Sequence, residues 1–159
     1  MIDLKEQAYG RNWGSDRVGI RYPSVSSCVT LTYYYKDLPL LVGVHFGMFN
    51  SNKQWLSGQE MDNILACMMN HAPDQAPTNA FLIGSLDYWD QNLIAKLQAH
   101  SSNLVPGGLD KVVQWDIPDD YKSSDIEINT CGVWSVRSNV APKLYNGRFQ
   151  AGKKLKAPV

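Results

Sequence analysis

The distribution of apolar residues along the chain predicts strands and helices. Apolar residues spaced three and four positions apart indicate helices from Ser57 to Pro73 and from Asp87 to His100. The first helix has the clearest beginning, because Ser57 and Glu60 have the spacing of a capping box, and Pro73 ends it. Runs rich in β-branched and aromatic residues, bounded by turn-forming residues, are typical of buried strands. The predicted strands are Cys28–Tyr35, Leu40–Phe46, Thr78–Gly84, Val112–Ile117 and Ile126–Arg137, the last being one strand or two interrupted at Gly132.

The order of these elements predicts an α+β fold. The strands at 28–35 and 40–46 are separated by a short turn, so we expect them to pair as a hairpin or at least to be neighbours. Because every element carries apolar residues, we expect a mixed β-sheet sandwich flanked by two main helices. The length of 159 residues fits one domain, 1–159. Residues 1–22 are interpreted as an irregular lead-in and 142–159 as a tail, in which Tyr145-Asn-Gly147 indicates a turn.

Composition and charge exclude several classes of function. Fifteen basic residues balance fifteen acidic ones, which gives no general attraction to nucleic acid or to anionic lipid. No apolar stretch approaches the length of a membrane span, and the N-terminus lacks the pattern of a secretory signal. The odd count of three cysteines indicates reduced thiols. We expect a monomer that binds no cofactor. We also expect no metal site, since Cys67 and His71, four residues apart on a helix, are too few ligands for zinc.

Cys28 and His45 are the candidates for a nucleophile and its base. Cys28 stands where a serine-rich turn enters a strand, and in an antiparallel hairpin Thr30 lies opposite His45, which brings the cysteine close to the histidine. A neighbouring histidine can take up the thiol proton and generate the reactive thiolate. The backbone N–H groups of Ser27 and Cys28 are the candidate oxyanion hole. Strand alternation puts His45 on the face of Gly43, which we expect to be partly open. On these residues alone, a buried structural cysteine and a hydrogen-bonded structural histidine remain the alternative.

The segments around this pair resemble a family of glutamine deamidases. Ser26-Ser-Cys-Val-Thr-Leu31 is followed, seventeen residues after the cysteine, by Val44-His-Phe-Gly-Met48. The two segments are similar to those that carry the Cys–His pair of the chemotaxis receptor deamidases. The same pair and fold are shared by the cytotoxic necrotizing factor toxins and the Burkholderia lethal factor, which deamidate a glutamine of a host protein. The later segments that begin at Gly84, Asn92 and Ile126 are similar to later parts of the same fold.

The resemblance implies a thiol-dependent hydrolase that deamidates a glutamine of a protein partner. The chemotaxis enzymes and the lethal factor orient the histidine with a threonine six residues before the cysteine, and that position is Tyr22 here. Ser24 is therefore the first candidate for orienting His45, Tyr22 the second, and a backbone carbonyl, as in the necrotizing factors, the third. The family's glycine before Ser-Cys is also replaced, by Ser26.

These departures favour a bacterial effector or toxin over a chemotaxis-receptor-type amidase. We expect the chain to be made in the bacterial cytoplasm, and export to a host or rival cell without a cleaved signal peptide remains open. The alternative from another class is a non-enzymatic binding or immunity protein in which Cys28 is merely buried.

Overall fold

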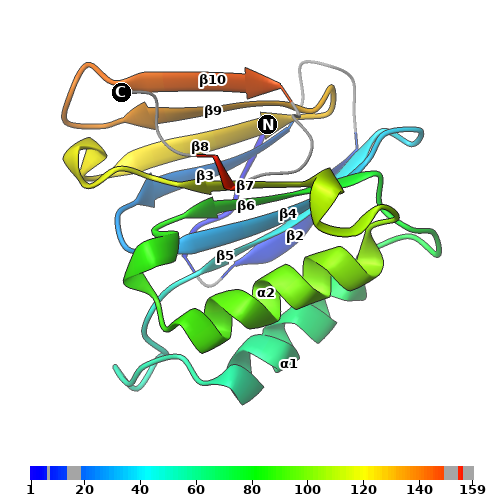
Figure 1. Ribbon diagram of the computed structural model, residues 1–159, viewed down its shortest axis with the longest axis horizontal. Helices are drawn as coiled ribbons and strands as arrows, with labels where there is room; N and C mark the ends of the chain where they lie inside the picture. Colours follow the sequence, from blue (N-terminus) through cyan, green and yellow to red (C-terminus); the bar gives the residue numbers. More distant parts are fainter. Residues whose placement is uncertain (7, 14–18, 149–153, 156–159) are drawn as a thin grey trace.

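The chain forms three layers, with two helices, a central sheet and a second sheet stacked in that order (Figure 1). The structure is a computed structural model that describes residues 1–6, 8–13, 19–148 and 154–155. Helices α1 and α2 cover one face of the central sheet and span Gly58–Met69 and Gln91–Leu104. The short 3-10 helices are η1 (Leu86–Tyr88), η2 (Gly108–Lys111) and η3 (Asp119–Tyr121).

Both sheets of the described chain are mixed. The central sheet has six strands in the order β11-β7-β6-β4-β5-β2, and the second sheet has five in the order β1-β3-β8-β9-β10. Parallel pairing joins β1 to β3, β6 to β7 and β7 to β11, and the other neighbours are antiparallel. The α+β prediction with a mixed sandwich and two helices is confirmed at this level. The central strands are β2 (Tyr9–Trp13), β4 (Val29–Tyr35), β5 (Leu40–Phe46), β6 (Asn79–Gly84), β7 (Val112–Asp116) and β11 (Lys154–Leu155). The others are β1 (Ile2–Asp3), β3 (Gly19–Val25), β8 (Ser124–Asn129), β9 (Val133–Ser138) and β10 (Leu144–Arg148).

Strands β4 and β5 are buried on both faces, because the helices cover one face and the second sheet covers the other. Successive side chains of a strand point to opposite faces, so each strand contributes to two cores. Val29, Leu31, Tyr33 and Tyr35 pack toward the helices, whereas Cys28 and Tyr34 pack between the sheets. The face that carries His45 is therefore covered by the second sheet, and the prediction that it would be partly open is wrong.

The two helices lie close to their predicted positions. The Ser57 side chain accepts a hydrogen bond from the Glu60 backbone N–H, and the Glu60 carboxylate accepts one from the Ser57 backbone, so the capping box is formed. Helix α2 begins at Gln91, later than the predicted Asp87, because η1 comes first and Asp90 then caps α2 through the backbone N–H of Asn92. None of the helices in the described part of the chain has the length and apolarity needed to cross a lipid bilayer.

The two ends of the chain are more regular than predicted. The segment 1–22, interpreted as an irregular lead-in, contains β1, β2 and the beginning of β3. The tail contains β10, so the turn predicted at Tyr145-Asn-Gly147 is strand instead. Gly147 serves close packing there, since a Cβ on this residue would lie 2.5 Å from the Trp134 ring. These strands obtain their hydrogen bonds from partners distant in sequence, which local turn signals do not reveal.

Candidate active site

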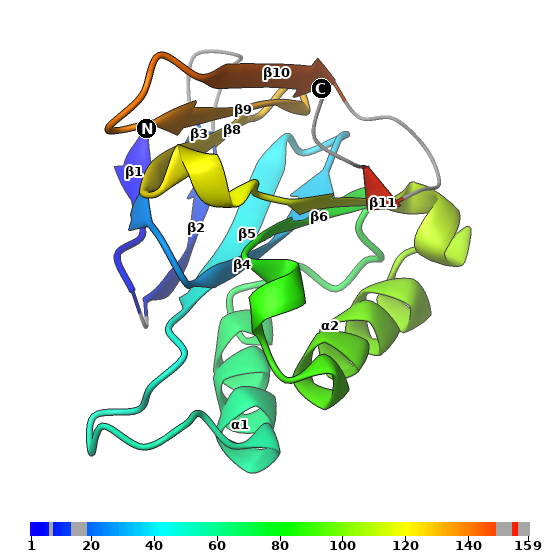
Figure 2. The same ribbon diagram turned by 60° about the vertical axis from the view of Figure 1, so that its left-hand side comes forward.

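Cys28 and His45 lie on the same face of the central sheet, at the end where β4 begins and β5 ends. The register pairs Thr30 with His45 and Val29 with Phe46, so the predicted hairpin is confirmed and Cys28 comes diagonally next to the histidine. Cys28 is 4% exposed and His45 is 1% exposed. The turn between β1 and β2 lies at the same end of the molecule (Figure 2).

The turn between β1 and β2 holds His45 at two points. The imidazole Nδ1 is 2.8 Å from the carbonyl oxygen of Leu4, and the backbone N–H of His45 donates to the carbonyl of Ala8 at 2.9 Å. Because a carbonyl only accepts hydrogen bonds, Nδ1 carries the ring proton of the neutral imidazole and Nε2 carries a lone pair. Nε2 is buried and has no hydrogen-bond partner in the described structure. His45 therefore presents an unused base.

Burial keeps this imidazole neutral. It lowers the pKa of His45 from the ordinary value of 6.5, although the bond to Leu4 and the negative charge of Glu6 act in the opposite direction. Near pH 7 the ring is therefore uncharged and can accept a proton at Nε2.

Tyr22 packs against the His45 ring without a hydrogen bond to it. The two rings meet edge to face, with centroids 5.8 Å apart and an interplanar angle of 88°. The Tyr22 hydroxyl is 2.6 Å from the hydroxyl of Thr32. Gly43 makes room for this tyrosine, since a Cβ on Gly43 would lie 2.0 Å from the phenolic oxygen. Tyr22 thus restricts the ring by contact and not by a hydroxyl–imidazole bond.

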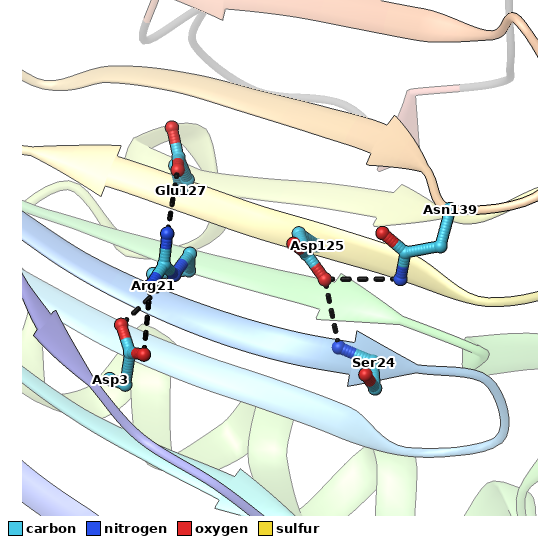
Figure 3. Close-up of polar contacts among 6 residues, drawn as sticks. All are labelled: Asp3, Arg21, Ser24, Asp125, Glu127 and Asn139. Atoms are coloured by element: carbon cyan, nitrogen blue, oxygen red, sulfur yellow. Dashed lines mark hydrogen bonds and ion pairs between the residues drawn. The ribbon is translucent and has the colours of Figure 1, made fainter.

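Ser24 lies at the rim of a surface hollow that reaches His45. The hollow has a volume of about 300 Å³ and is lined by Lys5, Glu6, Pro23, Ser24 and His45. A shift of register in β3 between Tyr22 and Val25 exposes Ser24, which has a φ of +56° and donates its backbone N–H to Asp125 at 3.0 Å (Figure 3).

The group that orients His45 therefore differs from the first two candidates. With Nδ1 bonded to Leu4 and Nε2 without a partner, neither Ser24 nor Tyr22 hydrogen-bonds to the ring. The third alternative, a backbone carbonyl, is the one present in the structure.

An ion-pair network fixes the strand that delivers this carbonyl. Arg21 on β3 donates to both carboxylate oxygens of Asp3 at 2.9 and 2.8 Å, and lies 4.0 Å from Glu127 on β8 (Figure 3). The backbone N–H of Leu4 donates to the carbonyl of Arg21 at 2.8 Å. The position of the Leu4 carbonyl is therefore set by β1–β3 pairing and by a bidentate side-chain contact.

Glu6 is the site residue that sequence reasoning missed. Its carboxylate lies over Gly47, where a Cβ would be 2.1 Å from Oε1, and its negative charge acts on the Cys28 thiol. Burial, and next the charge and hydrogen bond of Glu6, raise the pKa of the thiol from 9.0 to about 12, against a lowering backbone hydrogen bond from Ser27. The sequence did contain a signal for such a crossing, because another segment can approach a strand closely where it lacks a Cβ. This signal was the pair Gly43 and Gly47, two positions before and after His45.

The loop that leads into β4 is fixed from the side of α2. The indole N–H of Trp89 donates to the Ser27 carbonyl at 2.6 Å, and the Ser85 hydroxyl donates to the Ser26 carbonyl at 3.0 Å. The Ser85 backbone N–H donates to the Cys28 carbonyl at 3.0 Å. These contacts hold the segment whose N–H groups are the candidate oxyanion hole. A second hollow, of about 370 Å³, opens beside Ser26 and Ser27.

The arrangement provides a nucleophilic atom and a base. Within residues 1–6, 8–13, 19–148 and 154–155, no three His, Cys, Asp or Glu side chains are grouped so as to hold a metal ion. All three cysteines are free thiols. Comparisons of the chain with protein-family models, with curated proteins and with solved structures find no match.

Proposed function

We propose that the protein is a cysteine-dependent protein-glutamine deamidase, with Cys28 as nucleophile and His45 as base. One observation carries the proposal. The buried Nε2 of His45 has a lone pair and no hydrogen-bond partner among the described residues, while Leu4 fixes the proton on the opposite nitrogen. A buried polar atom without a partner costs free energy, and such atoms concentrate at functional sites. Cys28 lies on the same face of the sheet, diagonal to His45 in the register, whereas the directly opposite Thr30 donates its hydroxyl to the Ile83 carbonyl at 2.7 Å.

The proposed reaction begins with both groups neutral. As the sulfur attacks the side-chain carbonyl carbon of a glutamine, the thiol proton passes to Nε2 of His45. Backbone N–H groups of the Ser27–Cys28 segment stabilise the oxyanion. The C–N bond then breaks, and His45 returns the proton to the departing ammonia. Water, deprotonated by His45, breaks the thioester, leaves glutamate on the target and restores the thiol.

The orientation of His45 supports an effector or toxin of the necrotizing-factor type over the chemotaxis class. The resemblance assigns a threonine hydroxyl to this task in the chemotaxis enzymes and the lethal factor, and a backbone carbonyl in the necrotizing factors, and the Leu4 carbonyl corresponds to the second arrangement. In this proposal the chain is made in a bacterial cytoplasm, is delivered to a host or rival cell, and modifies a protein there. The change on that protein is one neutral amide becoming one negative charge.

A non-enzymatic binding protein is the second candidate, and one observation favours it. Cys28 is 4% exposed and its thiol pKa is about 12, as expected for a structural cysteine. A binding protein, however, would need neither the hydrogen bond between His45 Nδ1 and Leu4 nor a buried Nε2 that has no partner among the described residues. Catalytic hydrogen bonds are often absent until substrate is bound, so the lack of a bond between thiol and imidazole is compatible with catalysis.

The experiment is mass analysis of candidate target proteins incubated with purified chain. The native chain should add about one dalton to a glutamine-containing peptide, and Cys28→Ser should add nothing because a serine lacks the thiolate. Cys67→Ser is the matched control, since Cys67 is an exposed free thiol outside the site. An equal gain with Cys28→Ser would refute the mechanism.

A further inference from the structure

We infer that Glu6 occupies the acyl position of the active site in the resting protein, so that a substrate glutamine must displace it to reach Cys28. The inference rests on the proposed function, because it identifies what fills the site between reactions. It concerns a residue on the turn between β1 and β2, which also carries the Leu4 and Ala8 carbonyls that hold His45.

The geometry places the Glu6 carboxylate among the reacting groups. It crosses the chain at Gly47, the position opposite Cys28 when the β4–β5 register is continued by one pair, and a Cβ on Gly47 would lie 2.1 Å from Oε1 of Glu6. It also acts electrostatically on His45, and it lines the hollow that reaches this histidine. A carboxylate therefore lies beside the nucleophile and close to the base, on a side chain that is itself exposed.

The chemistry of this occupant matches that of the product. Deamidation converts a glutamine carboxamide into a glutamate carboxylate, and Glu6 is a glutamate whose carboxylate lies beside the cysteine. Its negative charge opposes formation of the thiolate, and its side chain covers Gly47, the position opposite Cys28. Lys5, next to it in the lining of the hollow, is the nearby cation that could receive the carboxylate when it withdraws. The occupied site is thus masked both sterically and electrostatically.

The first test replaces Glu6 by its amide. In Glu6→Gln, the side chain presents its own carboxamide to Cys28, so the chain becomes its own substrate. Sulfur attack would release ammonia and hydrolysis would restore a carboxylate at position 6, a gain of about one dalton in the N-terminal peptide. The double variant Glu6→Gln/Cys28→Ser should keep the amide. Gln75, an exposed glutamine in the loop after α1, is the internal control and should also keep its amide.

The second test needs no deamidation. Glu6→Ala should accelerate alkylation of Cys28 by iodoacetamide at pH 8 by about tenfold or more, since each unit of thiol pKa changes the thiolate fraction tenfold. Asp74→Ala, which removes an exposed carboxylate outside the site, should leave the rate unchanged.

The outcomes separate the inference from the proposed function. Conversion at position 6 supports both. Faster alkylation in Glu6→Ala without conversion in Glu6→Gln supports the masking role and counts against deamidation. Unchanged alkylation and an intact amide overturn the inference, and deamidation of a target by the same preparation would then leave the proposed function standing alone.

Discussion

The reactivity of the Cys28 thiol in the folded chain follows directly from its surroundings. Thiolates, not thiols, react with iodoacetamide. At pH 8, a thiol of pKa 9.0 is roughly one-tenth ionised, whereas one of pKa about 12 is ionised to roughly one part in ten thousand. Folding should therefore slow alkylation of Cys28 about a thousandfold through ionisation alone, before any effect of burial on access.

A short pulse of reagent measures this ratio. The folded chain and the urea-unfolded chain are alkylated at pH 8, and the peptides that contain each cysteine are quantified by mass spectrometry. Cys67 and Cys131 are exposed free thiols and serve as internal references for reagent quality. If Cys28 in the folded chain reacted within about tenfold of its unfolded rate, the thiol would have a nearly ordinary pKa, and the masking environment argued for Glu6 would be wrong.

Other predictions concern His45 and the residues that surround it. The folded-state pKa of His45 lies below the unfolded value of 6.5, so the unfolded chain binds the extra proton first. The contribution of His45 to stability is complete above pH 6.5 and is lost as the pH falls from 6.5 toward the folded-state pKa. His45→Asn should remove that part of the pH dependence of urea midpoints, and an unaltered profile would contradict the assignment. Gly43→Ala should lower the free energy of unfolding in urea by about 2–4 kcal/mol, because its Cβ meets the buried Tyr22 hydroxyl. Gly47→Ala should lower it by about 1 kcal/mol or less, because its Cβ meets the flexible Glu6 side chain. Displacement of Glu6 in Gly47→Ala should also speed alkylation of the Cys28 thiol. Similar stability losses in both variants would refute this contrast. Tyr22→Phe should lower stability by about 1–3 kcal/mol yet retain deamidation, and a collapse of activity with stability intact would show that the hydroxyl takes part.

Local signals predicted the elements that are stabilised locally. The capping box at Ser57, the end of helix α1 before Pro73, and the hairpin of β4 and β5 each depend on residues within a short stretch. The hairpin alone fixed the relation between Cys28 and His45, which is why the register could be predicted from the sequence.

The remainder of the site depends on contacts between distant segments. The carbonyl of Leu4 orients His45, and a backbone carbonyl has no residue identity by which a sequence could reveal it. Glu6 lies in a polar stretch whose role appears only when β2 pairs with β5 and β1 pairs with β3. The exposure of Ser24 likewise follows from an irregularity in the pairing of β3 with β8. Candidate residues could be inferred from their side-chain chemistry, whereas the pairing of distant strands could not be predicted from the sequence.

The double attachment of the β1–β2 turn to His45 has a consequence for the order in which the molecule becomes competent. The β4–β5 hairpin closes a short loop and can form early, but Leu4 and Ala8 reach the histidine only after the chain has closed loops of about forty residues. A newly made chain would thus pass through a stage with an ordinary, accessible thiol and an unoriented imidazole. Completion of the N-terminal contacts conceals the sulfur and prepares the base in one event, which protects the nucleophile from oxidation until a substrate displaces its cover.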